Sequence, residues 1–367
     1  MKLVADRRSL HAAFQHVGSI VTSTVARPIY QNVKMEATAE GVFLSATDLE
    51  VGVRVNAGPA EIEEEGQVLL PEARVSSILG ATPDDKVSFA GGESSVTIRS
   101  EDGVFRMVAE APADFVDIPA LSDENVIELD PQVLRYMVRR VVFAVAEERG
   151  RYALNGILLV IDEQGNFEMT AADGARLANV RKKASNSAKL AVDCIVMRKG
   201  LEQAARLAGL SDQPLKLQIT ESQMLAENEA GRLCCQIIEG QFPNYREVIP
   251  SESKLKKELP IRPLLNSLTR AAFLTTEQAR AVDFTFTDDL LTLRSQSPDV
   301  GEAEVRMPVD YKGEALTVAF NPSYIADMLK VIERDTVRVD INDGRSPCVW
   351  RSGGDYLYVV SPVVRED

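Results

Sequence analysis

The chain has 367 residues, of which 45% are hydrophobic and 26% charged, so it can bury real cores and should form two or three globular domains. Its formal net charge of −14 argues against tight nucleic-acid binding through salt contacts, although a protein that holds DNA by topology would escape that rule. No apolar run approaches the ~18–20 residues of a membrane span, and the amino terminus lacks the apolar stretch of a signal peptide.

The sequence has few of the residues and motifs that are typical of enzymes. Only two histidines occur, His11 and His16, and no phosphate-binding loop, dinucleotide-binding motif or zinc-protease motif is present. The four cysteines lack metal-ligand spacing, and the adjacent pair would point to opposite faces of a strand: Cys194, Cys234, Cys235 and Cys348. We therefore expect no metal, no cofactor and no disulfide, and a reduced cytoplasm fits best.

The first third of the chain predicts two helices among strands. Hydrophobic periodicity and turn residues predict one helix over Asp6–Val21, with Asp6 as the N-cap, and a second that has Pro71 in its first turn. The expected strands are Lys2–Val4, Ile29–Ala37, Val42–Val55, Val68–Leu70, Lys86–Phe89, Ser95–Arg99 and Val104–Ala109. A proline-marked connector, Ala111–Pro119, closes this part.

The same order returns twice. In the second third, helices are expected after Asp130-Pro131, with apolar residues as far as Val145, and from about Met197 to Leu207. Its strands are expected at Val126–Leu129, Leu154–Ile161, Phe167–Ala171, Arg176–Arg181, Leu215–Thr220, Gln223–Asn228 and Arg232–Ile238. A second connector, Glu239–Pro250, follows.

In the last third, helices are expected from Pro263 and from Asn321-Pro322. Its strands are expected at Lys257–Ile261, Ala281–Thr287, Leu290–Ser295, Glu302–Val309, Leu316–Phe320, Val337–Ile341, Cys348–Arg351 and Tyr356–Val360. We therefore predict an α+β protein of three repeated domains, residues 1–121, 122–250 and 251–367, each with two helices and antiparallel sheets. Three unrelated α+β domains are the alternative.

Basic residues recur on the predicted helices. Several pairs share a face opposite the apolar stripe: Arg135/Arg139, Lys199/Arg206, Arg262/Arg270 and Lys330/Arg334. Ordinary solvated helix faces would explain any one of them. Recurrence over six helices of an acidic protein instead indicates one basic surface that attracts phosphates without reading bases.

Five segments, in this order and spacing, resemble the bacterial DNA polymerase III β subunit family, the sliding clamps. They are Arg151–Leu159, Thr170–Ala178, Gln241–Pro250, Phe320–Leu329 and Tyr358–Asp367. The resemblance covers essentially the whole chain. It implies a head-to-tail homodimer that closes a ring with pseudo-sixfold symmetry around duplex DNA, with helices lining the pore. The implied function is that of a non-enzymatic processivity factor that tethers the polymerase and is opened by a separate ATP-driven loader.

The resemblance also implies a peptide-binding pocket between the second and third domains. Its residues in this sequence would be Leu154, Gly174, Arg176, Leu177, Pro243, Val248, Val359 and Ser361, with a neighbouring groove of Arg151, Asn321, Tyr324 and Val363. Aliphatic walls with a few polar groups suit an extended peptide that ends in Leu or Phe. Ser361, Ala172 and Ala175 stand where the family often has methionine, threonine and histidine, which predicts a shallower or less apolar pocket.

By the same resemblance, the DNA-contacting residues would be Arg27, Arg74, Arg135, Arg139, Arg151, Tyr152, Lys199 and Arg206. The ring interface would place Phe105 and Met107 against Phe273 and Leu274. Acidic residues around the second pair would face basic residues around the first: Asp299, Glu302 and Glu304 opposite Arg74, Arg99 or Arg106.

Two other classes of function stay open at this stage. Asp48, Glu50 and Asp173 could serve an acid/base hydrolase, although Asp173-Gly174 is more simply a tight turn. The repeats could also form a scaffold that binds proteins but never DNA. Retention on circular DNA, with release on linearisation, separates a clamp from both.

Overall fold

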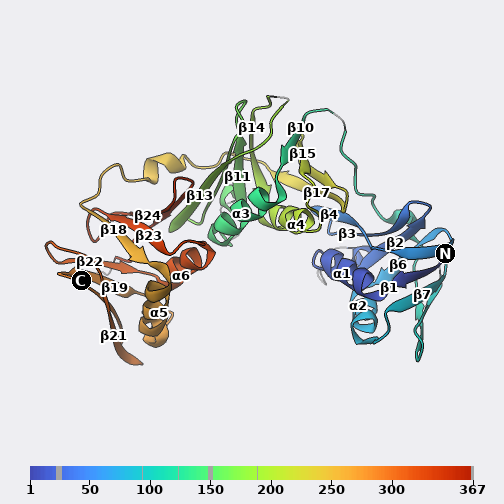
Figure 1. Ribbon diagram of the computed structural model, residues 1–367, viewed down its shortest axis with the longest axis horizontal. Helices are drawn as coiled ribbons and strands as arrows, with labels where there is room; N and C mark the ends of the chain where they lie inside the picture. Colours follow the sequence, from blue (N-terminus) through green and yellow to red (C-terminus); the bar gives the residue numbers. More distant parts are fainter. Residues whose placement is uncertain (22–26, 93, 123, 148–151, 188, 365–367) are drawn as a thin grey trace. The chain divides into compact units, whose positions relative to one another are not determined.

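The structure is a computed structural model that describes residues 1–21, 27–92, 94–122, 124–147, 152–187 and 189–364, without the Tyr152 side chain (Figure 1). These residues form two compact units. The first consists of Met1–Arg135, Ser185–Leu190 and Lys199–Ile237, and the second of Tyr136–Ala184, Ala191–Arg198 and Ile238–Asp367. Each unit is described by itself below.

The order of elements repeats three times along the chain: a strand, a helix, four strands, a second helix and three strands. The first repeat contains β1 (Lys2–Asp6), α1 (Arg7–Gly18), β2 (Asn32–Thr38), β3 (Gly41–Thr47), β4 (Val51–Asn56), β5 (Ala60–Glu64), β6 (Gly66–Pro71), α2 (Glu72–Ala81), β7 (Lys86–Gly91), β8 (Ser95–Arg99) and β9 (Val104–Val108). Strand β5 is an addition that the other two repeats lack in the described residues.

The second and third repeats follow the same plan. The second contains β10 (Val126–Leu129), α3 (Pro131–Val141), β11 (Gly156–Ile161), β12 (Asn166–Ala172), β13 (Arg176–Lys183), β14 (Val192–Met197), α4 (Arg198–Ala208), β15 (Leu215–Ile219), β16 (Gln223–Asn228) and β17 (Gly231–Ile238). The third contains β18 (Leu255–Pro260), α5 (Ile261–Ala271), β19 (Val282–Thr287), β20 (Leu290–Ser297), β21 (Gly301–Pro308), β22 (Leu316–Phe320), α6 (Pro322–Val331), β23 (Thr336–Ile341), β24 (Cys348–Ser352) and β25 (Tyr356–Val360). Short 3₁₀ turns connect them, among them η1 (Pro28–Gln31), η4 (Tyr152–Asn155), η5 (Tyr245–Val248) and η6 (Ala272–Leu274).

The pattern of strand pairing is also the same in all three repeats. In each repeat, the strand before the first helix pairs antiparallel with the strand after the second helix: β1 with β7, β10 with β15, and β18 with β23. The strands after the first helix form a second antiparallel sheet: β6-β2-β3-β4, β14-β11-β12-β13 and β22-β19-β20-β21. The α+β fold predicted from the sequence is confirmed, with two sheets and two helices in each repeat.

The helices cover one face of these sheets. Helices α1 and α2 lie side by side in the first repeat, and α5 and α6 do so in the third (Figure 1). The apolar stripe of α1 is buried at Leu10, Ala13, Phe14 and Val17, and the Asp6 carboxylate caps this helix by accepting from the Ser9 amide at 2.8 Å. Asn321 caps α6 in the same way, at 3.0 Å from the Ser323 amide, and the predicted Asp6 cap is confirmed.

Edge strands join consecutive repeats. Strand β4 pairs with β17, and strand β13 pairs with β25, both antiparallel. In each case the last strand of one repeat's second sheet meets the last strand of the following repeat. Within the described residues, this pattern leaves one strand of each type with an open edge, β21 in the third repeat and β9 in the first.

Several predicted boundaries were wrong for local reasons. The strand expected at Ile29–Ala37 begins only at Asn32, because Pro28 starts a 3₁₀ turn. Leu154 lies in η4 rather than in a strand, and Pro71 is the N-cap of α2 rather than part of its first turn. Helix α3 ends at Val141, before Val145, and α6 ends at Val331, so Arg334 does not share a helix face with Lys330.

The fold of the first unit carries a pH dependence. Burial of the His16 ring, helped by the charge of Arg206, lowers its pKa from 6.5 to about 4. The unfolded chain therefore takes up a proton below pH 6.5 that the folded chain refuses until about pH 4, so stability falls as pH drops through this window.

We expect His16→Gln to remove this contribution, which amounts to about 3 kcal/mol of unfolding free energy near the lower end of the window. Urea denaturation of both proteins at several pH values measures it. Carboxylates protonate in both proteins, so only the difference between the two curves reports on His16. Parallel curves would show that the imidazole is no harder to protonate in the folded chain.

Candidate functional site

A pocket of about 220 Å³ opens on the second unit. Eight of the residues predicted to bind a peptide line it together: Leu154, Gly174, Arg176, Leu177, Pro243, Val248, Val359 and Ser361. They come from η4, from the β12–β13 turn and the start of β13, from the connector after β17, and from β25 with the residue that follows it. Segments that are distant in sequence therefore meet at one apolar hollow.

The floor of the pocket is a buried apolar cluster on one face of a sheet. Leu177 of β13 lies opposite Val359 of β25, which in turn lies opposite Val349 of β24. Phe242 and Tyr245 of the connector pack onto this row together with Leu154 and Leu158. Residues that pair across neighbouring strands share a face, so the strand register itself brings these side chains together.

A buried carboxylate fixes the connector over the sheet. The Tyr245 hydroxyl donates to the Glu168 carboxylate of β12, and the Asn179 side-chain amide donates to the same oxygen at 2.6 Å. Burial raises the pKa of Glu168, but these hydrogen bonds outweigh it and leave the pKa below its ordinary value. Burial, followed by the contact with Glu168, raises the pKa of the Tyr245 phenol. The site thus holds an ionised carboxylate and a neutral phenol at neutral pH.

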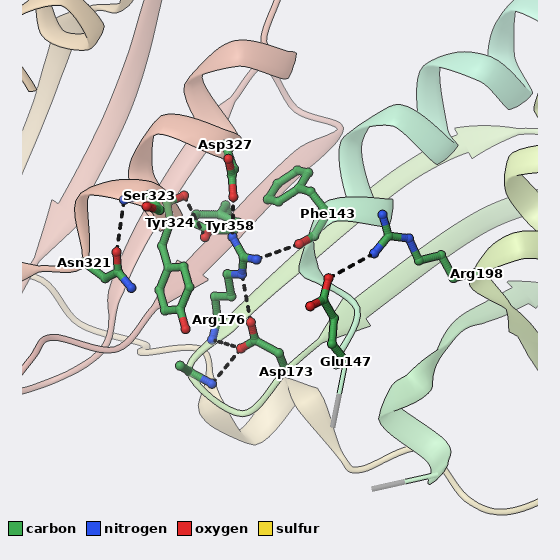
Figure 2. A network of polar contacts seen from close by, with 11 residues as sticks. Phe143, Glu147, Asp173, Arg176, Arg198, Asn321, Ser323, Tyr324, Asp327 and Tyr358 are labelled. Carbon is green, nitrogen blue, oxygen red and sulfur yellow. Dashed lines mark hydrogen bonds and ion pairs between the residues drawn. The ribbon is translucent and has the colours of Figure 1, made fainter. Parts of the chain in front are cut away.

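Arg176 ties the pocket wall to α6. Its Nε donates to Asp173 Oδ2 at 2.8 Å, its Nη1 to Asp327 Oδ2 at 2.9 Å, and its Nη2 to the Phe143 carbonyl at 2.7 Å (Figure 2). The guanidinium carbon lies 4.3 Å from the centre of the Tyr324 ring, and only 11% of the side chain is exposed. Because each of the three guanidinium nitrogens already donates to a partner and the side chain is largely buried, Arg176 shapes the site more than it offers hydrogen bonds to a ligand.

The other predicted groove residues lie beside this network. Tyr324 faces Arg176, and its carbonyl accepts from the Tyr358 hydroxyl at 2.9 Å (Figure 2). Asn321 caps α6, and the Val363 amide donates to the Ala319 carbonyl at 2.8 Å, which fastens the chain end beside β22. Arg151 lies outside the part of the chain that the structure describes.

Sequence reasoning missed four residues that line the pocket: Phe242, Asn244, Tyr245 and Pro347. Phe242 and Tyr245 could have been found, because aromatic residues inside a proline-marked connector commonly anchor it onto a core. Pro347 could not, since it belongs to the turn before β24 and nothing in its local sequence indicates the pocket.

The residues predicted to contact DNA fall into two groups. Arg27, Arg74, Arg135 and Arg206 are exposed. Arg139 pairs with Glu333 at 2.7 Å, and the partly buried Lys199 pairs with Asp48 and donates to the Ile20 carbonyl at 3.0 Å. Arg151 and the Tyr152 side chain lie outside the described residues. The exposed arginines are therefore better placed to attract phosphate than Lys199, whose ammonium already has partners.

The four residues predicted for the ring interface lie at the two open strand edges. Phe105 is 39% exposed on β9, where Met107 is half-buried, and Phe273 is 72% exposed on η6, which packs against β21. Strand β9 also exposes Val104 and Val108, which the sequence did not single out. Glu302 and Glu304 already pair with Arg294 and Arg306 of their own sheet. Both edges therefore combine exposed apolar side chains with charged neighbours.

Two of the three carboxylates considered for a hydrolase, Asp48 and Asp173, serve structural roles. Asp173 binds Arg176 and also accepts from the Ala175 and Arg176 amides at 2.9 Å, which closes the tight turn. Asp48 pairs with Lys199 and accepts from the Glu50 and Val51 amides. Among the described residues, no three metal-ligating side chains gather, and no helix is long and apolar enough to cross a membrane.

Comparison with known families matches three consecutive domains. The "DNA polymerase III beta subunit, N-terminal domain" matches residues 1–121, the central domain 128–244 and the C-terminal domain 246–360. Among characterised relatives, the beta sliding clamp of Chlamydia muridarum is 29% identical over 368 residues, with 100% of both chains covered. That of Vibrio cholerae is 28% identical over 371 residues, covering 99% of this chain and 100% of the relative.

Solved structures share the fold over its full length. The sliding clamp of Bartonella birtlesii bound to griselimycin superposes with a TM-score of 0.92 at 25% identity, with all of both chains covered. The sliding clamp of Bacillus subtilis superposes with a TM-score of 0.91 at 23% identity, again with full coverage. The three repeats read from the sequence thus match the architecture of these chains from end to end.

Proposed function

Because this chain belongs to the DNA polymerase III beta subunit family, we propose that two copies close head to tail around duplex DNA and hold partner proteins through the pocket at Leu177. The family is that of the sliding clamps, which are processivity factors rather than enzymes. A tethered polymerase stays at high effective concentration near its template, so the clamp needs no chemistry of its own. The one observation that carries the proposal is the pair of open strand edges.

The open edges indicate how the ring closes. Inside the chain, the last strand of a second sheet twice pairs antiparallel with the last strand of the following repeat. The same rule, applied between two chains, pairs β21 of one copy with β9 of the other. A head-to-tail contact of this kind produces either a closed ring or an open filament, and two copies of three repeats give the pseudo-sixfold ring. Pairing also removes the edges that would otherwise invite aggregation.

DNA binding by such a ring needs only weak and non-specific contacts. Arg74, Arg135 and Arg206 are exposed on α2, α3 and α4, on a chain whose net charge is −14. Arginines on helix faces attract phosphates without reading bases, while the acidic remainder of the molecule repels DNA. Topological closure then supplies the retention that these contacts alone would not. A cytoplasmic location, as the sequence predicts, suits this role.

The pocket supports an exchangeable peptide contact. Two apolar anchor side chains contribute ~1.5–3 kcal/mol each when buried, which with a few hydrogen bonds gives roughly micromolar affinity. Polymerase, loader and other partners could then replace one another on one ring. Three domains bounded at residues 1–121, 122–250 and 251–367 would place the connector Glu239–Pro250, and with it this pocket, between the second and the third.

Val248→Asp tests the pocket, because Val248 lines it yet is 50% exposed, so the chain should still fold. We expect binding of a short peptide that ends in Leu or Phe to weaken at least about tenfold, since an apolar contact is lost and a charge is introduced. Fluorescence anisotropy with a labelled peptide measures the affinity.

The matched control is Val116→Asp, a valine of the first connector that is 52% exposed and lies outside the pocket. It should bind the peptide like the unaltered protein. Equal affinities for both variants would show that the pocket is not where the peptide docks.

A further inference from the structure

A second hollow lies next to the pocket on the same sheet face. It encloses about 330 Å³, and its walls include Arg181 of β13, Arg338 of β23 and Arg351 of β24, together with the apolar Ile249 and Leu357. We call these five residues the arginine groove. The proposed function does not use it, and all five residues belong to the second unit.

Strand register makes the two hollows neighbours. Leu177 and Val359 form a cross-strand pair in the pocket, and Asn179 and Leu357 form the pair two residues further along, in the groove. Positions two apart on a strand point to the same face and lie about 7 Å from each other. Leu357 and Ile249 also pack against the buried cluster under the pocket, so an apolar surface runs from one hollow into the other.

A buried carboxylate holds two of the arginines in place. Asp340, only 7% exposed, accepts from Arg338 Nε and Nη2 at 2.7 Å each and from Arg351 Nε at 3.2 Å. Burial raises the pKa of Asp340, but these arginines outweigh it and keep the carboxyl ionised. Side chains held in this way lose little conformational entropy when a ligand arrives.

Both arginines keep donors for a ligand. Nη1 of Arg338 and both Nη groups of Arg351 donate to no atom of the described residues, and 40% and 34% of these side chains are exposed. Arg181 is 57% exposed and touches Glu168 at 3.2 Å. Asp355 also lies in the wall. Its carboxylate forms an ion pair with Lys182 at 2.5 Å and accepts a hydrogen bond from the Tyr136 hydroxyl at 2.6 Å.

The carboxylates around the groove are already engaged by cations: Glu168 pairs with Arg181 and Arg246, Asp355 with Lys182, and Asp340 with Arg338 and Arg351. Glu258, opposite Arg338 on β18, is exposed. Forked guanidinium groups with open N–H donors match the two oxygens of a carboxylate. The groove thus offers open guanidinium donors on an acidic protein, next to an apolar hollow of the size that takes a peptide side chain.

We propose that the arginine groove binds acidic side chains of partner proteins, placed two to four residues from the apolar anchor that enters the pocket. This inference rests on the proposed function, because the anchor must occupy the pocket first. An extended peptide advances about 3.3 Å per residue, so a residue two to four positions from the anchor reaches the arginines. Partners with acidic residues at this distance would then bind more tightly than partners without them.

Matched peptides test the proposal. Three peptides share one Leu/Phe anchor and carry aspartate, serine or lysine at the flanking positions, in one set before the anchor and in another after it. We expect the aspartate peptide of one set to bind about fivefold more tightly than its serine counterpart at low salt, with the gain lost at high salt. Fluorescence anisotropy measures all affinities.

The double variant Arg181→Gln/Arg351→Gln should abolish the gain while the serine peptide binds as before, since Arg338 still neutralises Asp340. The control is Lys312→Gln, because Lys312 is an exposed cation that pairs with Asp289 outside both hollows. This variant should leave the gain intact.

Equal affinities for aspartate and serine peptides, or a gain that survives the double variant, would overturn the proposal. The proposal would also fail if a single-stranded oligonucleotide bound the groove while the aspartate peptide bound no more tightly than the serine peptide. If no peptide binds even the unaltered protein, the proposed function itself fails.

Discussion

Phe105→Asp should convert the dimer, of twice 40.2 kDa, into monomers of 40.2 kDa. Phe105 lies on the open strand β9 and is 39% exposed in the single chain. A head-to-tail ring of two chains contains two identical interfaces, so one substitution acts twice. Burial of one phenylalanine stabilises by ~1.5–3 kcal/mol, and two therefore by about 3–6 kcal/mol, which corresponds to at least about a hundredfold in the dissociation constant.

Light scattering coupled to gel filtration at several concentrations measures the mass. Leu210→Asp is the control, because Leu210 is 51% exposed and lies on neither open edge. Phe273→Asp should act like Phe105→Asp, since Phe273 lies on η6 beside β21. A Phe105→Asp protein that stays dimeric at low concentration would show that β9 is not part of the ring interface.

Arg176→Ala should destabilise the second unit by about 3 kcal/mol and weaken peptide binding more than tenfold. The substitution leaves the Asp173 and Asp327 carboxylates without their shared cation and the Phe143 carbonyl without its donor. The turn at Asp173 carries Gly174 and Ala175 into the pocket wall, so its loosening should distort the pocket. Thermal unfolding and peptide anisotropy measure the two effects.

Arg181→Ala is the matched control for stability, because Arg181 lies on the same strand but is 57% exposed, and its partner Glu168 keeps its hydrogen bonds from Tyr245 and Asn179. It should cost less than about 1 kcal/mol. If Arg176→Ala loses the peptide yet melts at the same temperature as the unaltered protein, Arg176 contacts the peptide directly, and the structural role inferred from its occupied guanidinium is wrong.

Much of the fold was readable from the sequence because local signals agreed with the tertiary structure. Asp6 caps the helix it was expected to cap, a helix begins at Asn321-Pro322 as predicted, and proline marks both connectors. Boundaries failed where tertiary contacts override local pattern. Strand β5 was missed altogether, because its alternating residues Ala60–Glu64 are mostly acidic and the strand it pairs with, β1, lies far away in sequence.

Only part of the candidate site could be predicted from the sequence. The residues of the pocket were named through a family resemblance, and the strand register explains why Leu177, Val349 and Val359 gather there. The role of Arg176 could not be read, since its partners Asp327 and Phe143 lie 151 and 33 residues away. Lys199 looked like a DNA-binding residue on a helix face, and its ion pair with Asp48 is equally invisible in the sequence.

Retention on DNA circles tests the central claim, that this acidic chain holds DNA by encircling it. The protein is loaded onto a nicked circular plasmid by a bacterial clamp loader with ATP and then passed through gel filtration at high salt. We expect it to elute with the circles and to be released once a restriction enzyme linearises them, because a closed ring slides off a free end. Loss from intact circles at high salt, or equal retention on linear DNA, would contradict the claim.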